Sequence, residues 1–386
     1  MSVDFRVVVA GHDTARIDAL KAWLESTVAR DVRRHGETFD IATELPTESA
    51  LRTVVVVFCG ARALSEELLG FLKASRAGAV AIFPVVANLA DFTVQVPYFL
   101  QGINGFELPE VLGSPAAGVA DLGSLVIESL GLMRARRKIF ISYVRAESRG
   151  VALQLAEALP RRWYQVFLDT QSIAPGAEFQ ARLLEELTDS DMLILLGTAD
   201  VPNRPWVQVE IEAAVEAALG GLEVVWPHAR ALPEAAFLEQ LALTENTFDV
   251  ASGMPDSTLT QPALNVLLNR IADVRFKALA FRENALVEHV QFHARAQRWH
   301  ATLRRGRYVL LSKPGYQAIH LTTEVGVPDS RRFEAAVRIA EQESAAPRIL
   351  LDPTRLQVST RHHLNFLERR LDCPLVDFRT ADGLMA

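Results

Sequence analysis

The feature that most constrains this chain is a pattern that recurs three times along it. Short runs of apolar, β-branched residues alternate with stretches of helix length that are apolar on one side. Residues 54–58, for example, read Val-Val-Val-Val-Phe, and such a continuous apolar run predicts a strand that is buried on both faces. Alternation of such strands with helices is typical of parallel α/β sheets, so the predicted fold class is α/β.

The length of 386 residues is sufficient for two to three domains at roughly 100–200 residues each. We predict an N-terminal α/β domain at 1–120, a central domain at 136–250, and a helical connector with a small α/β domain at 256–386. A stretch rich in Gly, Pro and Ala after Phe99 marks the first boundary. The first two domains share an order of elements, so the N-terminal domain is either a relative of the central one or a generic α/β sensor domain.

Each domain has its own predicted elements. In the first, strands are expected at 5–10, 39–43, 52–59 and 79–86, and helices at 14–28, 65–74 and 121–134, the last leading into the central domain. In the central domain, strands are expected at 139–143, 165–169, 192–197 and 223–227, and helices at 149–159, 178–187 and 206–219. In the third, one or two long helices are expected over 262–303, strands near 308–312, 348–352 and 374–378, and helices at 331–343 and 360–371. The central series predicts a doubly wound sheet, in which ligands bind at the carboxyl ends of the strands.

Composition and charge exclude several classes of protein. A formal net charge of −7, with 49% apolar and 23% charged residues, excludes a disordered chain and a histone-like DNA wrapper. The longest apolar stretch, residues 78–90, is shorter than the ~18 residues of a membrane span, so no membrane contact is expected. The first residues lack the pattern of a signal peptide, and Cys59 and Cys373 lie in apolar settings that suit reduced thiols. We therefore expect a cytoplasmic protein.

The charge is distributed unevenly along the chain. Residues 281–386 hold 16 Lys and Arg against 12 Asp and Glu, whereas residues 1–280 hold 24 against 35. Six of the nine histidines also fall in the basic part. Either this region receives an anionic signal, such as a nucleotide or a nucleic acid, or it has an ordinary solvated basic face.

Three segments of the central domain place polar groups beside predicted strand ends or at a helix start. They are Phe140-Ile-Ser-Tyr143, then Leu168-Asp-Thr-Gln-Ser-Ile-Ala-Pro-Gly176, and finally Trp206-Val-Gln-Val-Glu210. Pro205 suits the first position of a helix, where no backbone donor is needed. Trp206 and Glu210 are four residues apart and therefore share one face of that helix.

In this order, the three segments resemble the boxes of the Toll/interleukin-1 receptor (TIR) domain family, over about residues 136–250. The resemblance implies a flavodoxin-like central sheet and one of two activities. Some members are adaptors that only self-associate, while others, including many bacterial ones, are NAD+ glycohydrolases that cleave the nicotinamide–ribose bond. In those enzymes the glutamate of the third box is catalytic, which corresponds to Glu210. NAD+ is then the substrate, the product is linear or cyclic ADP-ribose, and neither a cofactor nor a metal is expected.

The chemistry of this cleavage agrees with that role. Loss of neutral nicotinamide leaves positive charge on the ribose, which one fixed carboxylate can stabilise without a general acid. The other candidate contacts to NAD+ are Tyr143, Arg145, Asp169, Ser172 and Trp206. Each of three residues keeps an alternative role: Glu210 as a solvated acid of its helix, Trp206 as a core residue, and Asp169 as the cap of its own loop. After the first box this chain has Glu147 where many bacterial members have an aspartate, which places the local geometry in doubt.

The resemblance also implies a homo-oligomer or filament, because a neighbouring copy would order the loop of the second box over the site. In a bacterial host it implies defence against phage. The alternative is a non-catalytic scaffold that acts through homotypic contacts. Motifs of Rossmann dehydrogenases and P-loop ATPases are absent from the sequence.

Overall fold

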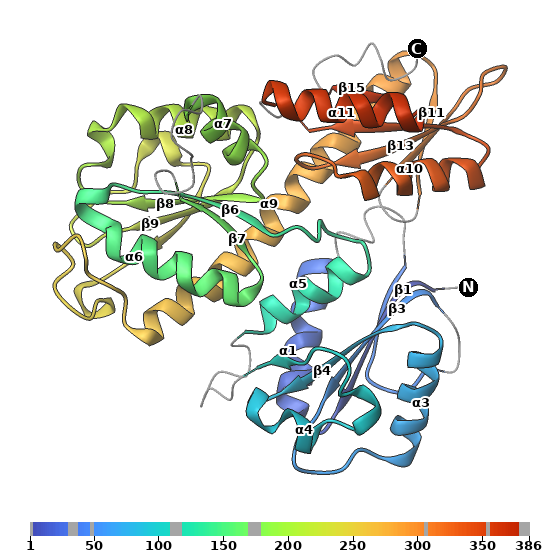
Figure 1. Cartoon of the computed structure of the whole chain (residues 1–386), viewed down its shortest axis with the longest axis horizontal. Coiled ribbons are helices and arrows are strands. Elements are labelled where there is room, and N and C mark those ends of the chain that lie inside the picture. The colour runs from blue at the N-terminus through green and yellow to red at the C-terminus, as the bar shows by residue number, and fades with distance from the viewer. Residues whose placement is uncertain are drawn as a thin grey trace. The chain divides into compact units, whose positions relative to one another are not determined.

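The computed structural model describes residues 3–29, 38–46, 50–108, 118–168, 179–304, 308–352 and 356–377. The chain divides into two compact units, Met1–Ala135 and Arg136–Ala386. The described residues form three five-stranded sheets with helices beside them, which confirms the α/β class (Figure 1). None of the described helices combines the length and the apolar character that a bilayer span requires.

The first unit contains a parallel sheet with the strand order β2-β1-β3-β4-β5. Its strands are β1 (Val3–Gly11), β2 (Phe39–Ala42), β3 (Ala50–Phe58), β4 (Ala81–Val86) and β5 (Phe106–Glu107). Its helices are α1 (Thr14–Leu24), α3 (Glu66–Ala77), α4 (Phe92–Gln95) and α5 (Val119–Ser129). Residues 54–57 of β3 are buried, as the apolar run predicted.

The end of the first unit differs from the prediction. The Gly-, Pro- and Ala-rich stretch after Phe99, which was expected to be a linker, contributes the short strand β5. Helix α5 packs against α1 within the same unit. Close packing is allowed because Gly123 of α5 faces Trp23, whose ring would lie 2.3 Å from an added Cβ. Helix α5 therefore belongs to the first unit and does not lead into the central domain. The first unit extends to Ala135, whereas the predicted boundary was residue 120.

The central sheet has the order β10-β9-β8-β6-β7, all parallel. Its strands are β6 (Lys138–Ser142), β7 (Gln165–Leu168), β8 (Met192–Gly197), β9 (Gly221–Val225) and β10 (Glu239–Ala242), and its helices are α6 (Arg145–Ala158), α7 (Phe179–Thr188) and α8 (Pro205–Glu216). Numbered along the chain, its strands lie in the order 2-1-3-4-5, the flavodoxin-like order that the first unit also has. The edge strand β10 was not predicted, because its residues Glu-Gln-Leu-Ala lack an apolar run.

Helices cover both faces of the central sheet. One face packs against α6 and α9 (Gln261–Ala296) through a core that includes Ile139 and Ile141. The other face packs against α7 and α8 through a core that includes Phe140 and Leu195. Side chains of a strand alternate between faces, so these two cores are built from alternate residues of the same strands.

The third sheet has the order β11-β12-β13-β14-β15, antiparallel from β11 to β13 and parallel from β13 to β15. Its elements are β11 (His300–Arg304), β12 (Tyr308–Ser312), β13 (Ile319–Glu324), α10 (Ser330–Gln342), β14 (Ala346–Leu351), α11 (Val358–Leu371) and β15 (Leu375–Asp377). Two predictions were wrong here. Residues 300–303 form a strand rather than the end of a helix, and the central strand β13 was missed because its His-Leu-Thr-Thr-Glu sequence is largely polar, although all of it is buried.

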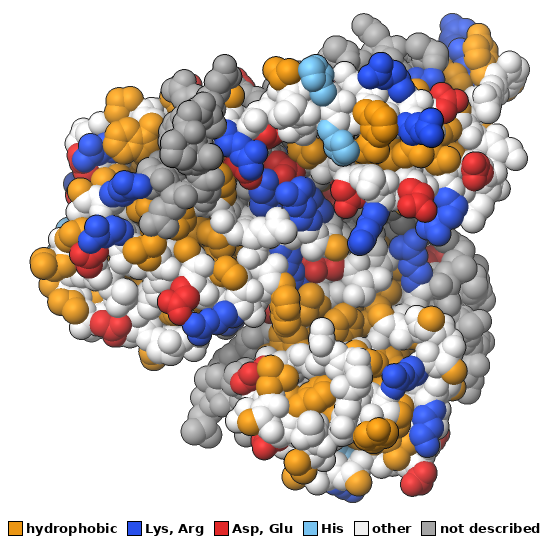
Figure 2. Space-filling model, in the orientation of Figure 1, with side chains coloured by type: hydrophobic (Ala, Val, Ile, Leu, Met, Phe, Trp, Pro, Cys, Tyr) orange, Lys and Arg blue, Asp and Glu red, His pale blue; other side chains and the backbone are white. Residues whose placement is uncertain are grey.

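The basic character of the C-terminal part is most evident on α11. Arg361, His362, His363, Arg369 and Arg370 of this helix are exposed. Figure 2 shows blue and pale-blue side chains over α11, with acidic side chains nearby over α10. The exposed surface of this part is therefore mixed in sign, and binding of an anionic signal remains a prediction.

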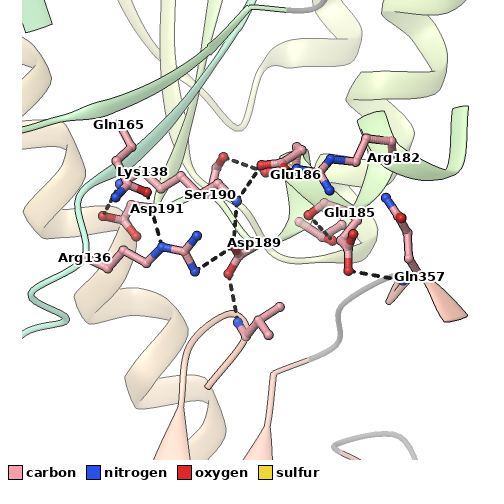
Figure 3. A network of polar contacts seen from close by, with 12 residues as sticks. Arg136, Lys138, Gln165, Arg182, Glu185, Glu186, Asp189, Ser190, Asp191 and Gln357 are labelled. Atoms are coloured by element: carbon pink, nitrogen blue, oxygen red, sulfur yellow. Dashed lines mark hydrogen bonds and ion pairs between the residues drawn. The ribbon is translucent and has the colours of Figure 1, made fainter. Parts of the chain in front are cut away.

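Charged residues join the central sheet to the C-terminal part at the amino ends of the strands, the edge opposite the one where such sheets bind ligands (Figure 3). Lys138, at the start of β6, is 2.6 Å from carboxylate oxygens of both Glu186 and Asp189. The other oxygen of Asp189 accepts a hydrogen bond of 2.8 Å from the backbone of Val327, and Glu185 accepts one of 3.2 Å from that of Gln357. The end of α7 is therefore tied directly to loops of the third sheet.

Candidate active site

Buried polar groups follow the carboxyl ends of three neighbouring strands of the central sheet. Ser142 ends β6, Thr198 follows β8, and Trp226 follows β9. The hydroxyl groups of the first two and the indole N–H of the third are buried and have no hydrogen-bond partner among the described residues. An unsatisfied buried polar group costs about 1–3 kcal/mol, so these atoms are candidates for contact with a ligand.

A row of paired residues crosses the sheet near this edge. Ser142 of β6 pairs with Leu195 of β8, which pairs with Glu223 of β9. Leu195 belongs to the core beneath α8, and paired residues of adjacent strands project to the same face. Ser142 and Glu223 therefore project toward the face that α7 and α8 cover.

Glu223 is a buried acid that the prediction missed. It is 0% exposed, and its Oε1 accepts a hydrogen bond of 2.8 Å from the backbone N–H of Leu232. Burial raises the pKa of Glu223, and the Leu232 hydrogen bond opposes this rise only in part. Its signal in the sequence was a lone charge within the apolar run from Leu222 to Trp226.

The two residues of the third box that were expected to act together differ in exposure. Val207, Ile211 and Ala214 of α8 pack against the sheet. Glu210 lies on this buried side and is 1% exposed, whereas Trp206 is 42% exposed. The Arg204 guanidinium lies 5.2 Å from the centre of the Trp206 ring, within the range of a cation–π contact. The solvated alternative for Glu210 and the core alternative for Trp206 therefore do not fit these positions.

Glu147 has a structural contact that the sequence did not predict. Its Oε2 accepts a hydrogen bond of 3.0 Å from the backbone N–H of Asp200, in the loop after β8. The Asp200 carboxylate pairs in turn with Arg204, which covers Trp206. Glu147, at the start of α6, therefore positions the loop that leads into α8. Glu147 is the residue that stands where many bacterial members of the family have an aspartate.

Two of the remaining predicted contacts, Tyr143 and Arg145, lie within the described residues. Tyr143 is buried in the core on the α6 side of the sheet, with Val151 and Leu155. Arg145 is the first residue of α6 and is exposed. Asp169 and Ser172, with most of the second box, lie outside the described residues.

Comparison with known proteins identifies the central part alone. Residues 139–250 match the family model of the TIR domain. The matched segment is less than a third of the chain. A search of curated protein sequences gave no significant match. The matched segment begins in β6 and extends past β10, so it contains the whole central sheet except Lys138.

Proposed function

Because residues 139–250 form a TIR domain, we propose that the chain cleaves the nicotinamide–ribose bond of NAD+, with Glu210 as the catalytic residue. The observation that carries the proposal is the burial of this one carboxylate, at the third-box position, on the side of α8 that packs on the sheet. Burying a carboxylate costs free energy that packing alone does not recover. A buried acid at the position of the family's catalytic glutamate is therefore the candidate catalytic group.

The proposed reaction needs one acid and no cofactor. The bond between the nicotinamide nitrogen and ribose C1′ breaks, its electron pair leaves with neutral nicotinamide, and positive charge develops on the ribose. The Glu210 carboxylate stabilises that charge through space. Water then adds to C1′ and loses a proton, giving ADP-ribose, or a nitrogen of the adenine adds instead, giving a cyclic product. Arg145, exposed at the start of α6, is the candidate partner of the pyrophosphate.

A matched pair of variants tests the assignment. Glu212 lies two residues beyond Glu210 on the same helix and is exposed, so Glu212→Gln removes an equal charge away from the core. With purified full chain and NAD+, we expect Glu210→Gln to lower the rate of nicotinamide release by about 10²–10³-fold, and Glu212→Gln to leave it unchanged. Equal activity in the two variants would contradict the catalytic role of Glu210.

We further propose that activity depends on self-association, and that NAD+ depletion in bacterial phage defence is its setting. A loop closed by a neighbouring copy would exclude water from the site. Nicotinamide release per chain should therefore rise with protein concentration. A rate per chain that stays constant over a wide concentration series would rule out this dependence.

The second candidate function is a scaffold, and an apolar cavity of about 420 Å³ favours it. This cavity lies beside the end of α8 and is lined by Val215, Phe237 and Phe281, which are 56%, 40% and 65% exposed. A second copy of the chain would cover these side chains. If the wild-type protein assembles but leaves NAD+ intact at every concentration, the scaffold function is supported and the hydrolase is excluded.

A further inference from the structure

A separate cavity of about 540 Å³ lies in the first unit, at the carboxyl ends of β1, β3 and β4. In the order β2-β1-β3-β4, the chain passes from β1 to β2 on one side and from β3 to β4 on the other side. The connections therefore diverge between β1 and β3, which makes the space at their carboxyl ends a topological switch point. Ligands of open α/β sheets bind at such points. The volume falls within the roughly 300–1,000 Å³ that is usual for small-molecule sites.

The backbone around the cavity is arranged so that the two loops meet. Gly11, the last residue of β1, has φ +130°, and a Cβ there would lie 2.3 Å from the carbonyl oxygen of Phe58. Only glycine allows the ends of β1 and β3 to approach this closely. Beyond them, Nε2 of His12 lies 2.9 Å from the carbonyl oxygen of Ala63, which joins the loop after β1 to the loop after β3.

The cavity is basic although its unit is acidic. Residues 1–135 hold 11 Lys and Arg against 16 Asp and Glu. Nevertheless Arg16, Arg62 and His12 line the cavity, and Asp13 is the one acid among the described residues that do so. Arg16 is 6% exposed and its Nε lies 3.2 Å from Oδ2 of Asp13. This ion pair holds the Arg16 guanidinium at the wall of the cavity.

Apolar side chains complete the lining. Phe58 and Val85, from the ends of β3 and β4, are both buried and line the same cavity. Guanidinium groups bind phosphate through paired hydrogen bonds, and an apolar wall suits a ring. We propose that this cavity binds a phosphorylated small molecule of nucleotide size, with its phosphate on Arg16 and Arg62 and its ring against Phe58 and Val85.

Two pairs of variants separate this site from the rest of the chain. An added Cβ at Gly60 meets no atom within 4 Å, so Gly60→Leu should fold normally and fill part of the cavity that Gly60 lines. Gly70 in α3 is equally unobstructed and lies outside the cavity, so Gly70→Leu is its control. Arg62→Ala removes an exposed cation of the cavity, and Arg76→Ala removes an exposed cation of α3.

The measurement is calorimetric binding of AMP, ribose 5-phosphate and adenosine to the full chain. We expect AMP to bind, ribose 5-phosphate to bind more weakly, and adenosine not to bind. Gly60→Leu and Arg62→Ala should each weaken AMP binding at least about tenfold, and the controls should not. Absence of AMP binding at millimolar concentration, or adenosine binding as tightly as AMP, would overturn the proposal. So would AMP binding that survives both cavity variants, because it would place AMP outside this cavity. The outcome is independent of NAD+ cleavage, since neither Glu210 nor turnover enters the measurement.

Discussion

The Nε atom of Arg275 lies 2.6 Å from Oδ2 of Asp191, and both side chains are 0% exposed. Asp191 stands directly before β8, and its Oδ2 also accepts a hydrogen bond of 3.2 Å from the backbone N–H of Lys138. Arg275 belongs to α9, the long helix that connects the TIR domain to the third sheet. One buried ion pair therefore attaches this helix to two strands of the TIR sheet.

Removing one partner of this pair should destabilise the protein strongly. Asp191→Ala leaves the Arg275 guanidinium buried without its carboxylate, so we expect the free energy of unfolding to fall by about 3–5 kcal/mol in urea titrations. The double variant Asp191→Leu with Arg275→Met should recover most of this loss, because it buries no charge. A cost below about 1 kcal/mol for the single variant would show that the pair is dispensable.

Arg282, two turns further along α9, should couple the two sheets of the second unit. Its guanidinium donates hydrogen bonds of 2.7 Å to the carbonyl of Ser190, 3.1 Å to that of Thr188, and 2.8 Å to Asp352 at the end of β14. We expect Arg282→Met to make the C-terminal part more susceptible to limited proteolysis, whereas Arg295→Met, at an exposed position of the same helix, should not. Identical cleavage patterns in these two variants would contradict the coupling.

Buried His320 should make stability depend on pH below neutrality. Burial, and secondarily the charge of Arg332, lower the pKa of His320 to about 4. Below its ordinary pKa of 6.5 the unfolded chain takes up a proton that the folded chain does not, so stability falls as pH falls toward 4. We expect a contribution of roughly 2 kcal/mol to be lost between pH 7 and pH 5. His320→Gln should remove that part of the pH dependence in urea titrations, and an unchanged profile would contradict the assignment.

Glu223 should act in the opposite direction. Because burial raises its pKa above the ordinary 4.5, the folded chain holds this proton more tightly than the unfolded chain. Its contribution to stability is therefore present at low pH and is lost as pH rises through the raised pKa. Glu223→Gln keeps an acceptor for the Leu232 N–H, so we expect a higher melting temperature than wild type at pH 8 and a shrinking difference toward pH 4. No difference at pH 8 would show that the acid is not destabilising there.

Trp206 offers a test of activity that is separate from stability. Since this side chain is 42% exposed, Trp206→Ala should change the free energy of unfolding by less than about 1 kcal/mol. If the ring contacts the nicotinamide or ribose, the same change should lower kcat/KM for NAD+ about tenfold or more. Val209→Ala, at a site of similar exposure on α8, is the control. Equal kcat/KM in the two variants would remove Trp206 from the site.

Much of the fold, and one element of the site, could be predicted from local sequence. Continuous apolar runs identified β1, β3, β6 and β8, because a strand covered on both faces is rich in apolar residues along most of its length. The three boxes were sufficient to identify the TIR domain, and the spacing from Trp206 to Glu210 located the helix that carries the candidate acid. These signals depend only on residues that are neighbours along the chain.

Only the tertiary structure decided which polar residues are buried and what they contact. The third box pointed to Glu210, but only the structure shows that Glu210 is buried while Glu212 is exposed, and that Glu147 holds the loop at Asp200. The row from Ser142 to Glu223, the buried strand β13, and the pairing of Arg275 with Asp191 likewise join segments far apart in sequence. The physical reason is that burial and partner choice are set by packing between elements, whereas apolar patterns and helix spacing are properties of each element by itself.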